Sequence, residues 1–163
     1  MRVIGVDPGT AICGWGVVDG GPGGALTALA YGAVRTPAGR DPGARLTAVY
    51  DGIRAVIARW RPERAVVEKL FFGTNATSAL AVGQARGVVL LALAQAGVPV
   101  LELSPAEVKQ ALTGYGRAGK AQMQAMVGRV LGLAEVPRPD DAADALAMAV
   151  TGVQVARFEE MTP

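Results

Sequence analysis

The spacing of apolar residues changes partway along this 163-residue chain, and that change limits the folds it can adopt. Residues 1–36 read as an apolar strand, a Pro-Gly turn, a second strand, a glycine-rich turn and a third strand, which together predict an antiparallel meander. From residue 41 onward, apolar residues recur at spacings of three and four, which is typical of an amphipathic helix. Pro62 is expected to stop this helix.

Further along, short β-branched runs alternate with helical segments. Strands are predicted over residues 64–72 and 98–105, and helices over residues 76–96, 105–114, 118–133 and from the aspartates near residue 140. Strands that begin antiparallel and then alternate with helices describe an α/β fold. The sequence therefore predicts a mixed five-stranded sheet, three antiparallel strands and then parallel ones, with helices on both faces.

The chain length suits one domain with a real hydrophobic core and is too short for two. We expect a single domain over residues 1–157 and a frayed C-terminal tail over residues 158–163. No charged segment precedes an apolar stretch of signal-peptide type, so a cytoplasmic location is expected. The most apolar segment, residues 87–101, is broken by Gly97 and Pro99 and is shorter than the roughly 20 residues of a membrane span, so no membrane contact is expected.

Composition excludes several kinds of chemistry. Histidine is absent and Cys13 is the single cysteine, so the chain lacks the commonest general base, a zinc site and an internal disulfide. Any catalysis must use carboxylates, hydroxyls, lysines or a metal ion held by oxygen.

The net charge of +2 is too small to indicate nucleic acid by itself, but the charge is unevenly distributed. Residues 104–138 contain five cations and two acids, an excess of three positive charges: Lys109, Arg117, Lys120, Arg129 and Arg138 against Glu107 and Glu135. One face is therefore expected to be basic around the acidic segment that follows.

Two acids interrupt predicted core strands. Asp7 follows the apolar run "VIGV", where an uncompensated charge would cost several kcal/mol. Glu68 follows a second such run. Each also has a purely structural role open to it, because Asp7 can bond its own turn backbone before Pro8 and Glu68 can pair with Lys69 or Arg64.

Three more acids, Asp140, Asp141 and Asp144, begin the last helix. Helix capping explains any one of them but explains three less well, since spacings of three and four stack like charges on one face. Acids at the ends of two core strands and at a helix start suit Mg²⁺ or Mn²⁺, which prefer oxygen ligands. Two such ions about 4 Å apart can hydrolyse a phosphodiester without histidine.

Four segments in order give the chain a specific resemblance: "GVDPGT" with "GWGVV", "VVEKLFFGTNATSALAVGQARG", "EVKQALTGYGRAGKAQM" and "DDAADALAMA". The chain resembles the RuvC family of Holliday-junction resolvases, members of the ribonuclease H-like superfamily. The resemblance implies a magnesium-dependent endonuclease that works as a homodimer, nicks two opposed strands of a four-way DNA junction, and acts with the branch-migration proteins RuvA and RuvB. It places the metal-binding catalytic acids at Asp7, Glu68, Asp141 and Asp144, whereas Asp140 departs from the motif and is interpreted as a helix cap or an outer-shell acid.

The same resemblance implies DNA contacts by Phe71, Phe72, Lys109 and Lys120, with Lys120 also catalytic. Phe71 is the favoured base contact, while Phe72 is the better candidate for the core. Either lysine can instead be an ordinary solvated helix charge. The long helix over residues 76–96 is either the dimer contact or a core helix buried on both sides.

Other function classes remain. Actin-like ATPases share the first strand and its glycine turn but need two such domains. A ribonuclease H acting on RNA:DNA hybrids is a second alternative, because it shares the metal site. A non-catalytic junction-binding protein is a third and is disfavoured, because a protein that binds a polyanion has no reason to gather acids on its surface.

Overall fold

The structure is a computed structural model that describes residues 1–70 and 76–162. Its centre is a five-stranded sheet in the order β3-β2-β1-β4-β5. β1 pairs antiparallel with β2, and β2 with β3, whereas β4 runs parallel to both β1 and β5. The strands are β1 (Arg2–Asp7), β2 (Ile12–Gly20), β3 (Leu26–Arg35), β4 (Arg64–Glu68) and β5 (Val100–Leu103). The predicted mixed sheet is confirmed.

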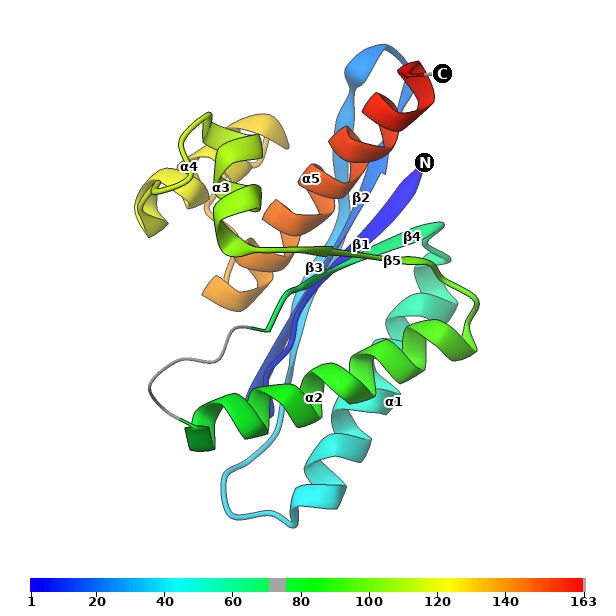
Figure 1. Ribbon diagram of the computed structural model, residues 1–163, viewed down its shortest axis with the longest axis vertical. Helices are drawn as coiled ribbons and strands as arrows, with labels where there is room; N and C mark the ends of the chain where they lie inside the picture. Colours follow the sequence, from blue (N-terminus) through cyan, green and yellow to red (C-terminus); the bar gives the residue numbers. More distant parts are fainter. Residues whose placement is uncertain (71–75, 163) are drawn as a thin grey trace.

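Helices cover both faces of this sheet (Figure 1). One face carries α1 and α2, which pack side by side, and the other carries α5 with α3 and α4 beside it. The helices are α1 (Pro42–Trp60), α2 (Ala76–Gln95), α3 (Pro105–Thr113), α4 (Lys120–Val130) and α5 (Asp140–Met161). α1 begins where the Asp41 carboxylate accepts a hydrogen bond from the Ala44 amide at 2.9 Å, and it ends before Pro62, as predicted.

α5 lies unusually close to β1 and β2 because glycines form the surface beneath it. A Cβ atom on Gly5 would lie 1.9 Å from the Ala145 carbonyl oxygen, and one on Gly14 would lie 2.2 Å from that of Asp141. Gly16, the cross-strand partner of Gly5, likewise has no room for a side chain under Leu146. The approach of α5 to the sheet therefore requires glycine on the strands.

Strand alternation then decides where the first two acids point. Val3 packs in the core under α5, whereas Ile4 and Val6 pack under α1 and α2, so Asp7 continues the α5 face. In β4, Val66 belongs to the α5 side, and Glu68 lies two residues further on the same side. Since Val6 pairs with Val67 in parallel register, the next residues of the two strands, Asp7 and Glu68, emerge together.

The C-terminal end of α5 corrects one expectation. Residues 158–161 continue the helix to Met161 and are not a frayed tail. The Glu159 carboxylate accepts a hydrogen bond from Arg64 at 2.6 Å, which ties the end of α5 to β4. Arg157 ties it to the turn between β2 and β3, which includes the short helix Pro22–Gly24, by donating to three backbone carbonyls: Gly21 at 2.7 Å, Ala25 at 3.0 Å and Gly24 at 3.1 Å.

α2 begins at Ala76, well before the most apolar segment of the sequence, residues 87–101. An 18-residue window of this 20-residue helix has a mean hydropathy of 1.5, so length and composition alone would suffice for a membrane span, although core helices of soluble proteins meet the same criteria. Only 22% of its apolar window is buried within the chain. This excludes α2 as a core helix buried on both sides and leaves an apolar face uncovered.

We predict that Gly5→Ala lowers the free energy of unfolding by about 1–3 kcal/mol or more, because the obstacle to the added methyl is the α5 backbone itself. Gly128→Ala is the matched control, since within the part of the chain that the structure describes no atom outside the local α4 backbone lies within 4 Å of its added Cβ. Alanine also favours a helix over glycine by about 1 kcal/mol, so this control should be neutral or stabilising. Urea unfolding measures both, and equal stability of the two variants would contradict the close packing of α5.

Candidate functional site

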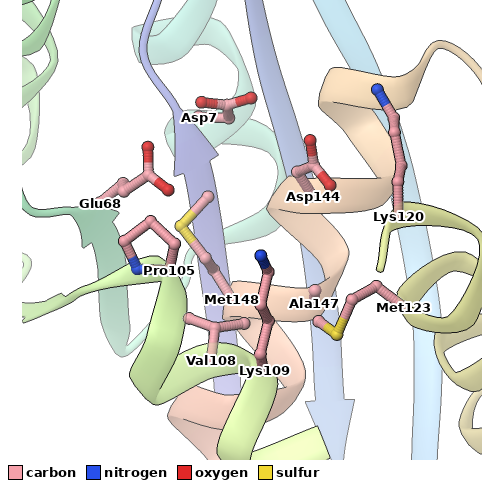
Figure 2. A pocket seen from close by; sticks show the side chains of 10 residues that line it. All are labelled: Asp7, Glu68, Pro105, Val108, Lys109, Lys120, Met123, Asp144, Ala147 and Met148. Atoms are coloured by element: carbon pink, nitrogen blue, oxygen red, sulfur yellow. The ribbon is translucent and has the colours of Figure 1, made fainter. Parts of the chain in front are cut away.

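Three carboxylates from three elements face one cleft of about 270 Å³ (Figure 2). Asp7 comes from the end of β1, Glu68 from the end of β4, and Asp144 from the second turn of α5. Helices α3 and α4 close the opposite side of the cleft. The lining residues are Asp7, Glu68, Pro105, Val108, Lys109, Lys120, Met123, Asp144, Ala147 and Met148.

The fourth predicted acid, Asp141, lies next to this cleft and not in its lining. Its Cβ would be 2.7 Å from a Cβ on Gly14, the residue that pairs with Asp7 across β1 and β2. Asp141 lines an adjoining groove together with Gly9 and Thr10 of the turn after β1. The structure thus brings Asp7, Glu68 and Asp144 into one cleft and places Asp141 at its edge.

The acids disfavour one another's charge. Burial of the carboxyl is the largest cause that raises the pKa of Asp7 to about 8. The charges of Glu68, Asp144 and Asp141 act in the same direction, and that of Lys120 opposes them. Burial, then the charge of Asp144, also raises the pKa of Glu68. Asp144 is an exposed residue. Desolvation of its carboxyl by the surrounding protein nevertheless raises its pKa.

This donor set fits a hard divalent cation. The cleft offers carboxylate oxygens and, in a chain without histidine, no imidazole nitrogen. A cation would relieve the repulsion that raises the pKa values of Asp7 and Glu68. Among residues 1–70 and 76–162, no three His, Cys, Asp or Glu side chains converge closely enough to enclose one ion. The acids therefore suit ions shared with a substrate, and not a closed protein cage.

Both predicted lysines line the cleft. Lys109 comes from α3, which begins with a capping box between Ser104 and Glu107, and Lys120 is the first residue of α4. The Lys109 charge lowers the pKa of Glu68 and the Lys120 charge lowers that of Asp7, so both lie within electrostatic reach of the acids. Two of the five cations behind the expected basic face therefore lie at the cleft.

Of the two roles predicted for Asp140, helix cap or outer-shell acid, the structure contradicts the first. The residue that caps α5 is Pro139, with no side-chain cap, so Asp140 is not the N-cap. Its carboxylate instead accepts hydrogen bonds from Lys120 Nζ at 2.7 Å and Gln124 Nε2 at 3.0 Å, both from α4. The charge-assisted bond with Lys120 is the main reason that the pKa of Asp140 is lowered.

Sequence reasoning missed Arg86. Its Nε donates to the Glu68 carbonyl oxygen at 3.0 Å, and its guanidinium pairs with Glu102, so it holds the end of β4 against α2 and β5. A signal existed, because Arg86 is the single charged residue within the apolar helix over residues 76–95.

The two phenylalanines predicted to contact DNA, Phe71 and Phe72, lie outside the described residues, so these assignments stay predictions.

Comparison with known proteins identifies the family. The family model described as "Crossover junction endodeoxyribonuclease RuvC" matches residues 3–152. A curated relative of that name from Chloroflexus aggregans is 61% identical over 150 residues, which cover 92% of this chain and 91% of the relative.

Two solved structures from Thermus thermophilus resemble this one over almost all of both chains. The RuvC structure has a TM-score of 0.89 at 40% identity and covers 98% of this chain and 97% of that one. The structure described as RuvC in complex with Holliday junction substrate has a TM-score of 0.89 at 38% identity, covering 97% and 96%. The predicted ribonuclease H-like fold is thereby confirmed, and the nucleases of this family are metal-dependent. Along nearly its whole length, this chain belongs to the RuvC family of crossover junction endodeoxyribonucleases.

Proposed function

We propose that this chain resolves four-way DNA junctions by metal-dependent hydrolysis of a phosphodiester bond in each of two opposed strands. The observation that carries the proposal is the cleft itself, where Asp7, Glu68 and Asp144 meet opposite Lys109 and Lys120. Family membership adds the substrate, because a relative with 38% identity is described in complex with a Holliday junction.

The acids have the metal-binding role in this proposal. Asp7, Glu68, Asp141 and Asp144 would hold two Mg²⁺ ions, with Mn²⁺ as a substitute, since carboxylate oxygens suit both. Bound divalent cations supply an activated water and stabilise the leaving oxygen. The contact of α5 with β1 and β2 keeps these carboxylates at one end of the sheet. The scissile phosphate of the bound strand would supply further oxygen ligands to the ions.

The lysines have the phosphate-binding role. Lys109 and Lys120 extend from α3 and α4 on the side of the cleft opposite β4 and β1 (Figure 2). Their positive charges attract the DNA backbone and stabilise the negative charge that builds up at the phosphate during cleavage. Phe71 and Phe72 follow β4 in the sequence, and Phe71 is the proposed contact to bases at the crossover, with Phe72 the second candidate.

A homodimer supplies the second active site, and α2 is the proposed interface. Leu80 and Leu91 are 65% and 51% exposed, and residues 80, 84, 87 and 91 form one exposed stripe along the helix. Among the described residues, no atom outside the surrounding helix backbone lies within 4 Å of a Cβ added at Gly87 in this stripe, so a second helix can approach closely there. Two symmetric nicks need two sites related by a two-fold axis, which such a contact provides.

RuvA and RuvB, which move the junction, are the proposed partners, and the cytoplasm is the proposed location.

Cleavage of defined DNA substrates tests the function. With Mg²⁺, wild-type protein should nick opposed strands of a synthetic four-way junction and leave an RNA:DNA hybrid and a linear duplex intact, as resolved on a denaturing gel. Four amide variants should slow cleavage by orders of magnitude but preserve junction binding without metal: Asp7→Asn, Asp141→Asn, Asp144→Asn and Glu68→Gln.

Asp51→Asn is the charge-matched control for these variants, because Asp51 is exposed on α1, which covers the opposite sheet face from the cleft. It should cut like wild type. Preferred cutting of the hybrid would favour a ribonuclease, and loss of binding together with cleavage in all four acid variants would make the acids structural.

The pKa of Asp7 predicts how stability depends on pH. The folded pKa of about 8 exceeds the ordinary value of 3.8, so the folded state binds this proton more tightly than the unfolded chain. Without divalent metal, the free energy of unfolding should fall as pH rises from about 4 to about 8.

The Asp7→Asn variant should lose most of this slope and exceed wild type in stability near pH 8. Mg²⁺ should stabilise wild type more near pH 8 than near pH 5, because its ligands must be deprotonated. Melting temperatures across this range measure both effects. A wild-type slope that Asp7→Asn leaves unchanged would mean that another group titrates.

The interface proposal predicts that Leu91→Glu yields a monomer, because two glutamates would face each other across the two-fold axis. Size-exclusion chromatography with light scattering measures the mass, and cleavage should shift from paired to single nicks. Val136→Glu is the control, an exposed valine (42%) in the connection between α4 and α5. A Leu91→Glu protein that stays dimeric would place the interface elsewhere.

A further inference from the structure

Asp140 is in contact with a residue of the cleft although it does not line the cleft itself. Its two carboxylate oxygens have separate partners: Oδ2 accepts from Lys120 Nζ at 2.7 Å, and Oδ1 accepts from Gln124 Nε2 at 3.0 Å. The two donors lie one turn apart on α4. The carboxylate is therefore fixed in orientation, and it fixes the amine of Lys120 in turn.

Lys120 needs such a contact in order to have a defined position. Its side chain is 59% exposed, and a free lysine has four rotatable bonds and a large rotamer entropy. Asp140 lies one turn before Asp144 on α5. The pair therefore fixes Lys120 relative to the helix that carries a carboxylate of the cleft, beside Asp144 (Figure 2).

Neither helix capping nor stability accounts well for Asp140. It does not cap α5, whose N-cap is Pro139. An exposed ion pair of this kind contributes little to stability, so stability alone gives little reason for a third aspartate beside two mutually repelling ones. What the contact does provide is a fixed place for the amine.

We propose that Asp140 is a positioning residue for cleavage: it holds the Lys120 amine at the cleft, where the lysine meets the scissile phosphate. The inference depends on the proposed junction-cleaving function. In this role Asp140 is an outer-shell acid and not a cap, and it affects the cleavage rate through Lys120.

Chemical labelling tests the contact independently of activity. The chain has three lysines, Lys69, Lys109 and Lys120, so peptide mass spectrometry after brief treatment with an amine-acylating reagent reports each one. Asp140→Asn should raise acylation of Lys120 and leave Lys69 and Lys109 unchanged. Unchanged acylation of Lys120 would overturn the proposal.

A double-mutant cycle tests the consequence for cleavage. Under single-turnover conditions, Asp140→Asn should slow junction cleavage by about tenfold, the value of one charge-assisted hydrogen bond. In a Lys120→Met background the same change should slow it by less than about twofold. Asp140→Glu should recover part of the rate, and junction affinity without metal should not fall in Asp140→Asn, because a negative charge is removed.

The cycle has two outcomes that overturn the inference. Equal slowing by Asp140→Asn in both backgrounds would show an action that bypasses Lys120, and wild-type speed in Asp140→Asn would show that the contact has no catalytic effect. Asp51→Asn controls for charge and should match wild type in both assays, while melting temperatures confirm folding. If Asp140→Asn raises acylation of Lys120 as expected but the wild-type protein does not cut the junction, the proposed function is overturned. The contact between Asp140 and Lys120 is then still supported.

Discussion

The close contact between α5 and the glycine surface of β1 and β2 is the constraint on which the rest of the structure depends. Side chains on Gly5, Gly14 or Gly16 would push α5 outward. Because Asp141 and Asp144 lie at the beginning of this helix and Asp7 at the end of the strand beneath it, any such displacement would separate the acids. The alanines that α5 presents to the sheet serve the same end, since they let two backbones approach without voids. The site exists because small residues occur on both sides of one interface.

That interface creates an electrostatic cost which the protein does not remove by itself. Four carboxylates gather in and beside a partly buried cleft, and burial raises the pKa of three of them. Lys109 and Lys120 offset only part of the repulsion. The gathered carboxylates thus make the empty site less stable, a cost that bound divalent cations would relieve. Arg86 does not line the cleft, but it holds the backbone of Glu68 through a hydrogen bond to the Glu68 carbonyl oxygen.

Most of the fold and the acids of the site could be predicted from the sequence, because both depend on local patterns. The change of apolar period indicates the strand and helix order, and an acid in an apolar strand, as at Asp7, is a strong signal. The contact of Asp140 with Lys120 could not be predicted, since it depends on α4 and α5 meeting at their N-terminal ends, a tertiary contact without a local pattern. For the same reason the exposure of α2 remained undecided: its sequence is apolar on all sides, and only packing shows which side is left open.

The two arginine contacts at the far end of α5 have a consequence for the accuracy of the site. Where α5 lies on Gly5 and Gly14, the strands have no side chain that could interlock with the helix and resist a slide along its axis or a rotation about it. A rotation by one residue, about 100°, would replace Asp141 with a neighbour beside Asp7. Arg157 on the turn between β2 and β3, and Glu159 on Arg64 of β4, fix the axial register of α5 roughly 20 Å from Asp144. The position of Asp141 and Asp144 at the beginning of α5 is therefore set in part by contacts at the opposite end of the helix.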